Sequence, residues 1–564
     1  MNNETISSKT PWWVLALALA VCWVGIFDRD LWTPDEPRDA AVALAMAQSG
    51  NYVVPLLAEE PFIEKPPMYF AVAGLAAKLT GGLLGNVGAI RMTTALWGLG
   101  VLWMTYLLGR RLVDRTTGLM AVLLLATMEG FVENMHWIRV DASLAFFVAA
   151  AVWCFAEMFL ADRPWYAVPA GLFTAGAFLS KGVIGPLFVG MGWLGFALPC
   201  WLAQWREQRR VRLYIAPHLA ALLAFAVGAG IWMILLRVVG GKALWDEWFW
   251  DNHVGRLTGT STALGHLHPG EPWYYLQTLA MYSMPWLPLL LLGFWRFEKE
   301  ARAGGLATLW KNPGLPLVLW GVGSLVMLSI SVTKRDIYLL PAFPAFALLC
   351  AMMVRGKQPR WIGGFYAFWM GLCAVALFAA ALAPLWSSFL PAGVRAHFPS
   401  SLLHFGLRHL AVAAIFVAAV FLIWAKNRWS APIRWIAVTA LVYIAVFAVP
   451  GKAIDEAKSM GAAYKAFVDR IPVERRERAA AWGFSETTRG GLYFYAGASF
   501  QRIHEMERLD AILKGNDPEF DSVIIDREKD LDALLKRPYR ILAEGHPGSG
   551  KRKRPLFWVE GADR

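Results

Sequence analysis

The chain has 564 residues, of which 57% are hydrophobic and only 17% are charged. Soluble domains average about 45–50% apolar and about 25% charged residues, so this composition excludes an ordinary soluble enzyme and a disordered chain. The net charge is +12, but the basic residues lie in short loops between apolar stretches, which argues against a nucleic-acid-binding protein. The composition is that of a protein embedded in a lipid bilayer.

Thirteen apolar stretches are long enough to cross a bilayer as helices, since a crossing needs about 20 mostly apolar residues. They cover residues 11–27, 86–108, 115–131, 142–160, 165–180, 183–203, 215–239, 276–295, 313–332, 337–354, 361–384, 404–424 and 433–450. The first stretch is expected to remain as a span, because Lys9 is the only basic residue before it and no small-residue cleavage site follows. The sequence therefore predicts a polytopic α-helical membrane protein.

The orientation of these spans follows from their loops. Alternate loops are rich in Lys and Arg, namely residues 110–115, 206–212, 296–311, 355–360 and 426–434. Such loops face the cytoplasm, so the N-terminus is expected there too. The opposite set of loops is expected to face outward and comprises residues 28–85, 132–141, 240–275 and 385–403.

From residue 451 onward the chain is charged and has only short apolar runs. We interpret residues 1–450 as the membrane domain and residues 451–564 as a small soluble α/β domain on the outer side. Its expected strands are Ala479–Phe484, Ser522–Asp526 and Arg540–Ala543, and its expected helices are Arg508–Lys514 and Lys529–Leu535. It has no glycine-rich phosphate loop, so it is interpreted as a lid or scaffold.

The first outer loop holds the residues that packing explains least. Thr33 can cap a helix that continues through the apolar residues 40–49, with Glu36 as the acid of a capping box. That interpretation gives Glu36 a structural role. The capping interpretation does not explain Asp35, whose carboxylate is expected at the membrane surface. Asp35 is therefore the stronger functional candidate.

Further along the same loop, Glu64 and Lys65 stand directly before Pro66 and Pro67. Neighbouring Glu and Lys residues usually form a solvated ion pair of little energetic value. Here the prolines restrict the backbone and hold Lys65 extended. A stiffened ion pair at the membrane boundary indicates a functional role.

These motifs resemble those of the aminoarabinose lipid A transferases, which are polytopic GT-C glycosyltransferases related to the protein O-mannosyltransferases. The shared pieces are Leu-Trp-x-Pro-Asp-Glu-x-Arg at 31–38, Ser-Gly-(x)3-Val-Pro at 49–55 and Glu-Lys-Pro-Pro at 64–67. The layout of spans, acidic first outer loop and outer C-terminal domain is similar as well. An aromatic residue often follows the arginine in this family, whereas Asp39 follows it here, so no role is carried over to Asp39.

The resemblance implies an inverting transfer of 4-amino-4-deoxy-L-arabinose from undecaprenyl phosphate to phosphate groups of lipid A. This modification of lipopolysaccharide confers polymyxin resistance. The implied location is the bacterial inner membrane, with the site on the periplasmic side. The implied partners are the lipid-linked donor, lipid A and the bilayer, with no nucleic acid, and the chain is expected to be a monomer.

Two other functions stay open. A related enzyme could transfer mannose or another sugar from a polyprenyl phosphate to protein or glycan, and the sequence separates the two weakly. A transporter is disfavoured, because transporters place ionisable residues near the middle of their spans and often contain repeats. In this chain the charges cluster at the outer ends, and no internal repeat is evident.

In the implied reaction a leaving phosphate and an acceptor phosphate meet at one carbon, so cations must offset their repulsion. The cationic and hydroxyl candidates in the outer loops are Arg38, Lys65, Arg256, Lys334, Arg335 and Tyr338. Lys334 and Arg335 lie in a short outer loop where basic residues are not expected. The alternative is that Lys334 and Arg335 snorkel to lipid headgroups. For Tyr338, the alternative is an aromatic anchor at the membrane interface.

The amine of the sugar and the acceptor phosphate also call for carboxylates. Asp35, Glu64 and Asp141 are the outer acids nearest the expected interface. A phosphate group with a second pKa near 6 needs little base, so Asp35 is expected to position the acceptor. No cofactor is expected to be required.

A loosely bound divalent ion such as zinc is a further hypothesis, with Glu64 and His253 as its ligands. A plain hydrogen-bonded loop histidine is the favoured interpretation of His253. The helix at 39–49 is expected to lie flat with its apolar side in lipid. Residues 53–64 carry few structural signals and are expected to order when the lipid donor binds.

Overall fold

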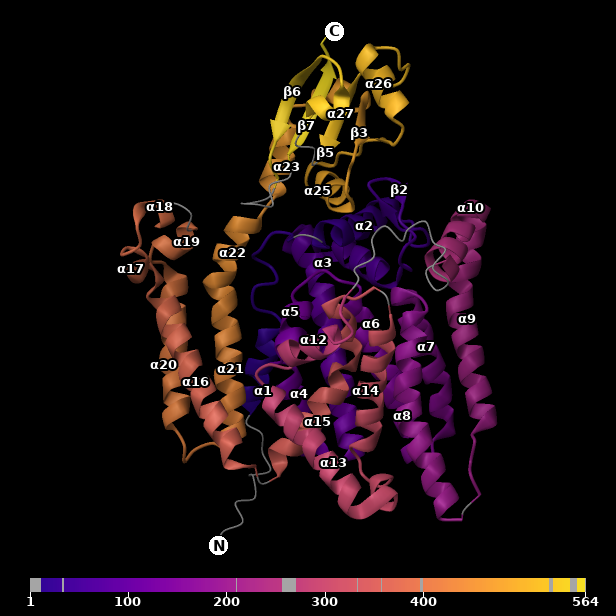
Figure 1. The fold of residues 1–564 in the computed structure, drawn as a ribbon, viewed down its shortest axis with the longest axis vertical. Coiled ribbons are helices and arrows are strands. Elements are labelled where there is room, and N and C mark those ends of the chain that lie inside the picture. The colour runs from indigo at the N-terminus through magenta and orange to yellow at the C-terminus, as the bar shows by residue number, and fades with distance from the viewer. Residues whose placement is uncertain are drawn as a thin grey trace.

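The computed structural model describes residues 12–32, 35–208, 210–255, 270–331, 333–356, 358–395, 399–526, 531–547 and 555–562. Figure 1 shows a broad helical bundle with a smaller region above it that contains a sheet. The first half of the bundle contains α1 (Trp12–Val21), α2 (Glu36–Ser49), α3 (Met68–Leu112), α4 (Arg115–Leu125), α5 (Glu129–Met135), α6 (Asp141–Leu160), α7 (Ala167–Lys181), α8 (Ile184–Arg206), α9 (Ile215–Val239) and α10 (Gly241–Asp246). The second half contains the π-helix η2 (Glu247–Gly255), α12 (Tyr274–Tyr282), α13 (Leu287–Leu309), α14 (Leu315–Ile330), the 3-10 helix η4 (Asp336–Ala342), α15 (Phe343–Arg355), α16 (Arg360–Ala381), α17 (Ala383–Ser387), α18 (Ala392–Arg395), α19 (Ser400–Leu403), α20 (Leu407–Trp424) and α21 (Ala431–Ala448).

In the part of the chain that the structure describes, each of the thirteen predicted spans contains helix, although α1 covers only Trp12–Val21 of the span 11–27. The prediction of a polytopic helical membrane protein is confirmed. Within the described residues, eight helices are long and apolar enough to cross a membrane, or up to ten if each bent pair forms one span. The predicted spans 115–131 and 276–295 are not straight, because α4 and α5 meet at 67° and α12 and α13 at 117°. The number thirteen stays a prediction.

The loops predicted to face outward gather at one end of the bundle. In Figure 1, α2, α10, α18, α19 and the short strand β2 (Glu60–Pro61) all lie at the end that carries the C-terminal sheet, whereas α8 and α9 are joined at the opposite end. This arrangement agrees with the grouping that the basic loops indicate.

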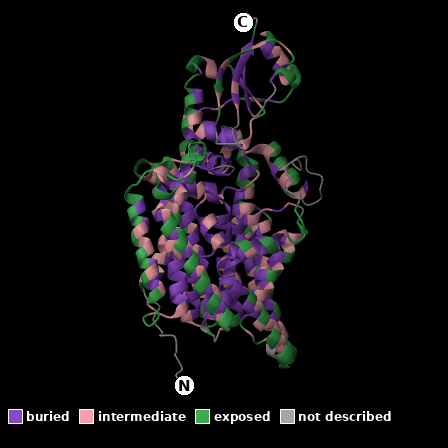
Figure 2. Cartoon of the chain, turned by 60° about the vertical axis from the view of Figure 1, so that its left-hand side comes forward, coloured by how far each residue is buried: buried purple, intermediate pink, exposed green. Residues whose placement is uncertain are grey.

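Small residues allow the helices of the bundle to pack closely. A Cβ atom on Gly109 of α3 would lie 2.6 Å from the Cα of Gly118 in α4, and one on Gly171 of α7 would lie 2.1 Å from the carbonyl oxygen of Ala221 in α9. Close backbone approach is how helices associate where no water is present to drive them together. Figure 2 shows the result, a buried centre surrounded by exposed outer helix faces.

The C-terminal region begins with α22 (Pro450–Lys458), α23 (Gly461–Val468) and α24 (Val473–Arg476). Its five-stranded sheet has the order β4-β3-β5-β7-β6, with parallel pairing from β4 to β5 and antiparallel pairing beyond. The elements are β3 (Ala479–Trp482), α25 (Glu486–Ala496), β4 (Arg502–Ile503), α26 (Met506–Lys514), β5 (Ser522–Asp526), α27 (Leu531–Leu535), β6 (Tyr539–Gly545) and β7 (Leu556–Gly561). The three predicted strands and two predicted helices are present, whereas α25, β4 and β7 were not predicted.

Two predictions for α2 are wrong. Residues 40–46 are buried on all sides, at 7% exposure or less, because α2 packs between α3 and α25 and does not lie in lipid. The helix begins at Glu36 with Asp35 at its N-cap, and Asp35 makes no side-chain cap. Glu36 is therefore not the third residue of a capping box, and Thr33 lies outside the described residues.

The segment 53–64, predicted to carry little structure, contains a short hairpin. Its strands are β1 (Leu56–Leu57) and β2 (Glu60–Pro61), which pair antiparallel. Leu57, Phe62 and Ile63 are buried. The hairpin lies beside α2 and below the C-terminal sheet region.

Candidate active site

Asp35 lies at the centre of a group of arginines. Asp35 is buried, and its side chain is 7% exposed. Arg38 of α2 places Nη2 3.2 Å from Oδ1, and Arg335, just before η4, places Nη2 2.5 Å from Oδ2. Arg139, between α5 and α6, adds a third guanidinium with Nε 3.8 Å from Oδ2. Three segments that are distant in the sequence thus converge on one carboxylate.

These cations determine the ionisation of Asp35. Burial alone would raise the pKa of Asp35, but the charges of Arg38, Arg335, Lys65 and Arg139 outweigh burial and hold the pKa well below its ordinary value. Burial would likewise lower the pKa of Arg335, but the ion pair with Asp35 raises it. Asp35 is therefore ionised at physiological pH, and it is a good hydrogen-bond acceptor but a weak base.

Arg38 extends the group toward Lys65 and toward the C-terminal region. Its Nε lies 2.7 Å from Oδ1 of Asp39, and its Nη1 lies 3.0 Å from Oε2 of Glu486, the first residue of α25. Nζ of Lys65 is 3.5 Å from the same oxygen of Asp39. Glu64 contributes to the electrostatic environment of Arg38. The structure thus places Lys65 beside Asp39, in the same group as Asp35 and Arg38, and the functional role predicted for Glu64 and Lys65 stays a prediction.

A second ion pair lies beside this group. Asp141, the first residue of α6, binds Lys181 at the end of α7. The ammonium group of Lys181 is 3.9 Å from the ring centre of Tyr338. Lys181 was not predicted, although it directly follows the predicted span 165–180 at the outer end, where the positive-inside rule does not expect a lysine. This exception to the positive-inside rule is the feature of the sequence that indicates a functional role for Lys181.

Lys334 and Arg335 do not behave alike. The guanidinium of Arg335 binds Asp35, so the alternative that Arg335 snorkels to headgroups is wrong. Lys334 is 8% exposed and donates through Nζ to the carbonyl of Ser331 at 2.7 Å. It therefore shapes the loop that presents Arg335.

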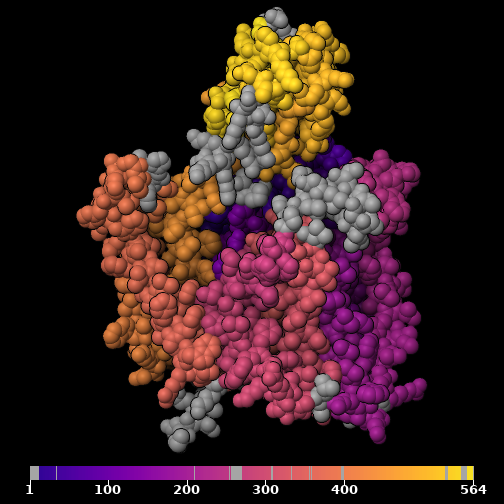
Figure 3. Space-filling view, in the orientation of Figure 1, coloured from indigo at the N-terminus to yellow at the C-terminus, as the bar shows by residue number. Residues whose placement is uncertain are grey.

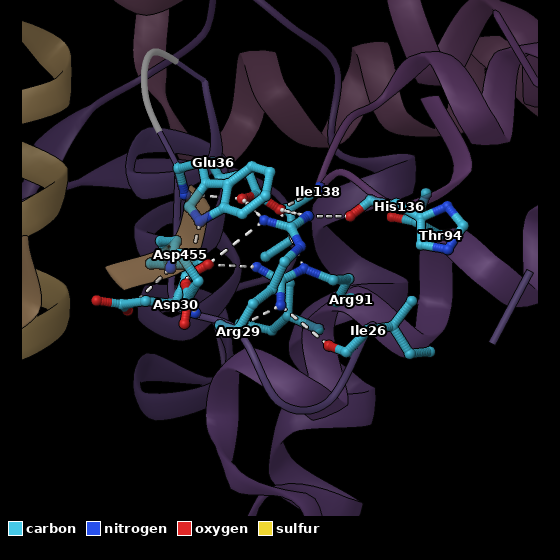
Figure 4. A network of polar contacts seen from close by, with 12 residues as sticks. Ile26, Arg29, Asp30, Glu36, Arg91, Thr94, His136, Ile138 and Asp455 are labelled. Atoms are coloured by element: carbon cyan, nitrogen blue, oxygen red, sulfur yellow. Dashed lines mark hydrogen bonds and ion pairs between the residues drawn. The ribbon is translucent and has the colours of Figure 1, made fainter. Parts of the chain in front are cut away.

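Glu36 lies in a separate buried network, which Figure 4 shows. Arg29 binds both of its oxygens, at 2.8 and 3.1 Å, and Nε of Arg91 in α3 lies 3.1 Å from Oε1. The backbone N–H groups of Trp32 and Ile138 donate to the same carboxylate at 2.8 and 3.0 Å. Glu36 is therefore structural, as predicted, but it joins three chain segments and does not cap α2.

The comparison with solved structures decides the fold. ArnT from Cupriavidus metallidurans in the apo state superposes with a TM-score of 0.71 over 97% of both chains at 18% sequence identity. The same protein bound to undecaprenyl phosphate gives a TM-score of 0.70 over 97% of both chains at 20% identity. The chain has the fold of ArnT.

Sequence comparisons agree with this fold. Residues 64–233 match the family described as dolichyl-phosphate-mannose-protein mannosyltransferase. An undecaprenyl phosphate-alpha-4-amino-4-deoxy-L-arabinose arabinosyl transferase 2 of Sodalis glossinidius is 27% identical over 63% of this chain and 62% of its own length. The corresponding transferase of Pseudomonas aeruginosa is 26% identical over 61% of this chain and 59% of its own length. The chain thus spans about three fifths of these relatives, and the resemblance inferred from its motifs is confirmed.

Two predicted residues of this ArnT-like fold cannot be placed in the site. Arg256 lies outside the described residues, and the side chain of His253 lies outside the described part of η2. The pairing of His253 with Glu64 on a metal ion therefore stays a prediction. Among the described residues, no group of three or more His, Cys, Asp or Glu side chains is arranged to hold a metal ion.

The C-terminal region binds the first outer loop next to the site. Arg489 donates to the carbonyl of Leu57 at 2.7 Å, and Arg502 binds the carboxylate of Glu60. A Cβ atom on Gly490 would lie 2.5 Å from the carbonyl oxygen of Pro37, so α25 rests directly on the start of α2. No local sequence pattern indicates these contacts, because they join segments more than 400 residues apart.

Proposed function

We propose that the protein transfers 4-amino-4-deoxy-L-arabinose from undecaprenyl phosphate to phosphate groups of lipid A. The observation that carries this proposal is the group of cations around one ionised, buried carboxylate, at the end of the bundle where the outward loops gather. Two phosphates can approach each other only where fixed cations offset their charge. The names of the curated relatives supply the sugar and the lipid carrier.

In the proposed reaction, Asp35 positions the acceptor. Its low pKa makes proton abstraction a poor role, whereas an ionised carboxylate accepts a hydrogen bond from a protonated phosphate oxygen. Lys65, Arg335 and Tyr338 bind the leaving phosphate, and Arg38 holds Asp35 in place. The acceptor oxygen attacks the sugar carbon from the face opposite the leaving phosphate, which inverts its configuration.

The proposed location is the bacterial inner membrane, with the site on the periplasmic side. The distribution of basic loops supports this orientation. Lipid A as acceptor, a monomeric state and a loosely bound divalent ion at Glu64 and His253 remain parts of the proposal. No cofactor is needed for the transfer itself.

A mannosyl-type transferase acting on protein or glycan is the second candidate. The family match over residues 64–233 favours it, because that family is described by transfer of mannose to protein. Both reactions use a polyprenyl phosphate as the leaving group, so the same cations serve either one. The products separate the two candidates.

The test is mass spectrometry of lipid A from cells with and without the gene. We expect aminoarabinose on the lipid A phosphates only when the gene is present. Asp35→Asn removes the charge and keeps the shape, and it should abolish the modification at normal expression. Asp28→Asn is the matched control, because Asp28 forms a half-exposed ion pair with Arg408 at 3.2 Å. Unmodified lipid A together with mannosylated protein would favour the second candidate.

A further inference from the structure

The β1–β2 hairpin of the first outer loop has a strained turn. Its strands contain two residues each, and Ala58 and Glu59 join them. Both joining residues have positive φ angles, of 49° and 68°. A two-residue turn with two positive φ angles prefers asparagine and glycine, because other side chains crowd the backbone there. So short a hairpin is not stable alone, and a strained turn persists only where its surroundings hold it.

The C-terminal region holds this turn. Arg489 of α25 donates through Nη2 to the carbonyl of Leu57 at 2.7 Å, and Ser499 donates through Oγ to the carbonyl of Ala58 at 2.8 Å. Nη2 of Arg489 also lies 2.9 Å from Oε2 of Glu60. Leu57 and Ala58 are buried, and buried carbonyls need a partner. Figure 3 shows indigo chain directly beneath the yellow C-terminal region. Both donors to the turn thus come from a segment more than 400 residues away.

The hairpin leads directly to Lys65. The backbone N–H of Phe62 donates to the carbonyl of Pro55 at 2.8 Å, so the two arms of the hairpin stay together beyond β2. Phe62 is buried, and Nζ of Lys65 lies 5.9 Å from the centre of its ring. Two prolines follow Lys65, and α3 begins directly after them. Lys65 therefore lies between the start of a long helix and a hairpin, and a movement of the hairpin would move Lys65.

We propose that Arg489 is a positioning residue of the reaction. It holds the hairpin in its strained form and thereby places Lys65 where this side chain binds the phosphate of undecaprenyl phosphate. The assignment rests on the proposed function, which gives that phosphate to Lys65. A cation that is already in place binds its ligand more tightly than one that must be ordered during binding. Without Arg489, the lipid itself would have to order the hairpin.

The first test is proteolysis of the purified full chain in detergent by chymotrypsin, which cleaves after Leu57 and Phe62. The wild type should be cleaved slowly there with and without undecaprenyl phosphate. Arg489→Ala should be cleaved quickly without the lipid and slowly with it. Arg475→Ala is the matched control, because Arg475 also binds two carboxylates, but within the C-terminal region, and it should behave as the wild type. Slow cleavage of Arg489→Ala without the lipid would overturn the proposal.

The strain in the turn provides a rescue that separates positioning from general stability. Glu59 is exposed, and glycine adopts its φ angle of 68° without strain. Adding Glu59→Gly to Arg489→Ala should therefore restore slow cleavage in large part. A C-terminal region that has merely become unstable would not respond to a change in the turn. Fast cleavage that Glu59→Gly leaves unaltered would thus overturn the role of Arg489. Ser499→Ala should give a weaker form of the same defect, with the same rescue.

The second test is the affinity of the purified protein for undecaprenyl phosphate in phosphatidylglycerol vesicles. Arg489→Ala should raise the Kd about tenfold, and Glu59→Gly should reverse most of this change. In a Lys65→Ala background, Arg489→Ala should cause no further loss, because its effect passes through Lys65. Additive losses, or an unchanged Kd in Arg489→Ala alone, would overturn the proposal.

This binding assay needs no sugar transfer, so the two proposals fail separately. If the wild type binds undecaprenyl phosphate and shows the expected dependence on Arg489 but transfers no aminoarabinose, the proposed function fails and the positioning role stands. If the wild type transfers aminoarabinose and Arg489→Ala binds the lipid as tightly, the positioning role fails alone. Absence of lipid binding by the wild type would overturn both.

Discussion

Replacing Glu36 with glutamine should destabilise the protein without touching its chemistry. The carboxylate of Glu36 is 0% exposed and accepts five hydrogen bonds, of which three come from Arg29 and Arg91. An amide has one acceptor oxygen and carries no charge, so the variant leaves two buried guanidinium groups facing a neutral side chain. Removing one partner of a buried ion pair costs about 3–5 kcal/mol.

The ionisation of Glu36 gives a second measure of the same energy. Burial would raise the pKa of Glu36, but Arg29 and Arg91 outweigh it and lower the pKa from 4.5 to about 2. At about 1.4 kcal/mol for each pKa unit, this change corresponds to about 3 kcal/mol. Because the pKa is lowered in the folded state, this stabilisation is fully present above about pH 4.5. It is lost as the pH falls toward 2.

The assay is unfolding of the purified protein in detergent, measured for the wild type, Glu36→Gln and Glu60→Gln. Glu60 is the matched control, since two arginines also bind it but its side chain is 34% exposed. An exposed ion pair of this kind contributes about 1 kcal/mol or less. Glu36→Gln should therefore lower the unfolding midpoint far more than Glu60→Gln at neutral pH. Equal midpoints for the two variants would refute the buried network as the main anchor of the first loop.

Three further results are expected. Lys65→Ala should lower the rate of transfer by about 10²–10³-fold, far more than Glu36→Gln does in folded protein, and the reverse order would show that the wrong residue of the loop was chosen. Tyr338→Phe should slow transfer by about tenfold if the hydroxyl binds phosphate, whereas an interfacial anchor would tolerate the change. Proteolysis between Tyr52 and Lys65 should be equally slow with and without undecaprenyl phosphate, because Arg489 and Arg502 already hold the β1–β2 hairpin, and faster cleavage without the lipid would show that the lipid orders this segment.

The sequence was sufficient for features that depend on local pattern. The apolar stretches predicted helices correctly, because a segment buried in lipid must satisfy its backbone within itself. The sequence also singled out Asp35, Lys65, Asp141 and Arg335, since charged residues at the outer ends of apolar spans are hard to explain by packing. The structure places these residues near one another, and their roles stay predictions.

Features that depend on distant contacts could not be predicted. The alanine-rich α2 was expected to lie in lipid, but the same small side chains allow α3 and α25 to cover it, and its sequence cannot distinguish the two surroundings. The helix α25 carries Gly490 and Gly491, which are unfavourable in an isolated helix. It is a helix because Ser485 caps it and because these glycines fit against Pro37 and the ring of Tyr464.

The spacing of the motif around Asp35 now has a physical explanation. Glu36 anchors the start of α2 to Arg29 and Arg91 in the bundle, and Arg38 anchors it to Glu486 of the C-terminal region. Asp35 directly precedes Glu36 and lies three residues before Arg38, so these two independent attachments fix the position of its carboxylate. If either attachment were lost, the start of α2 and the carboxylate of Asp35 with it could shift. A shift of as little as about 1 Å is enough to weaken the positioning of a phosphate by this carboxylate. The C-terminal region, which contributes no residue predicted to contact substrate, thus acts on the site through Arg38.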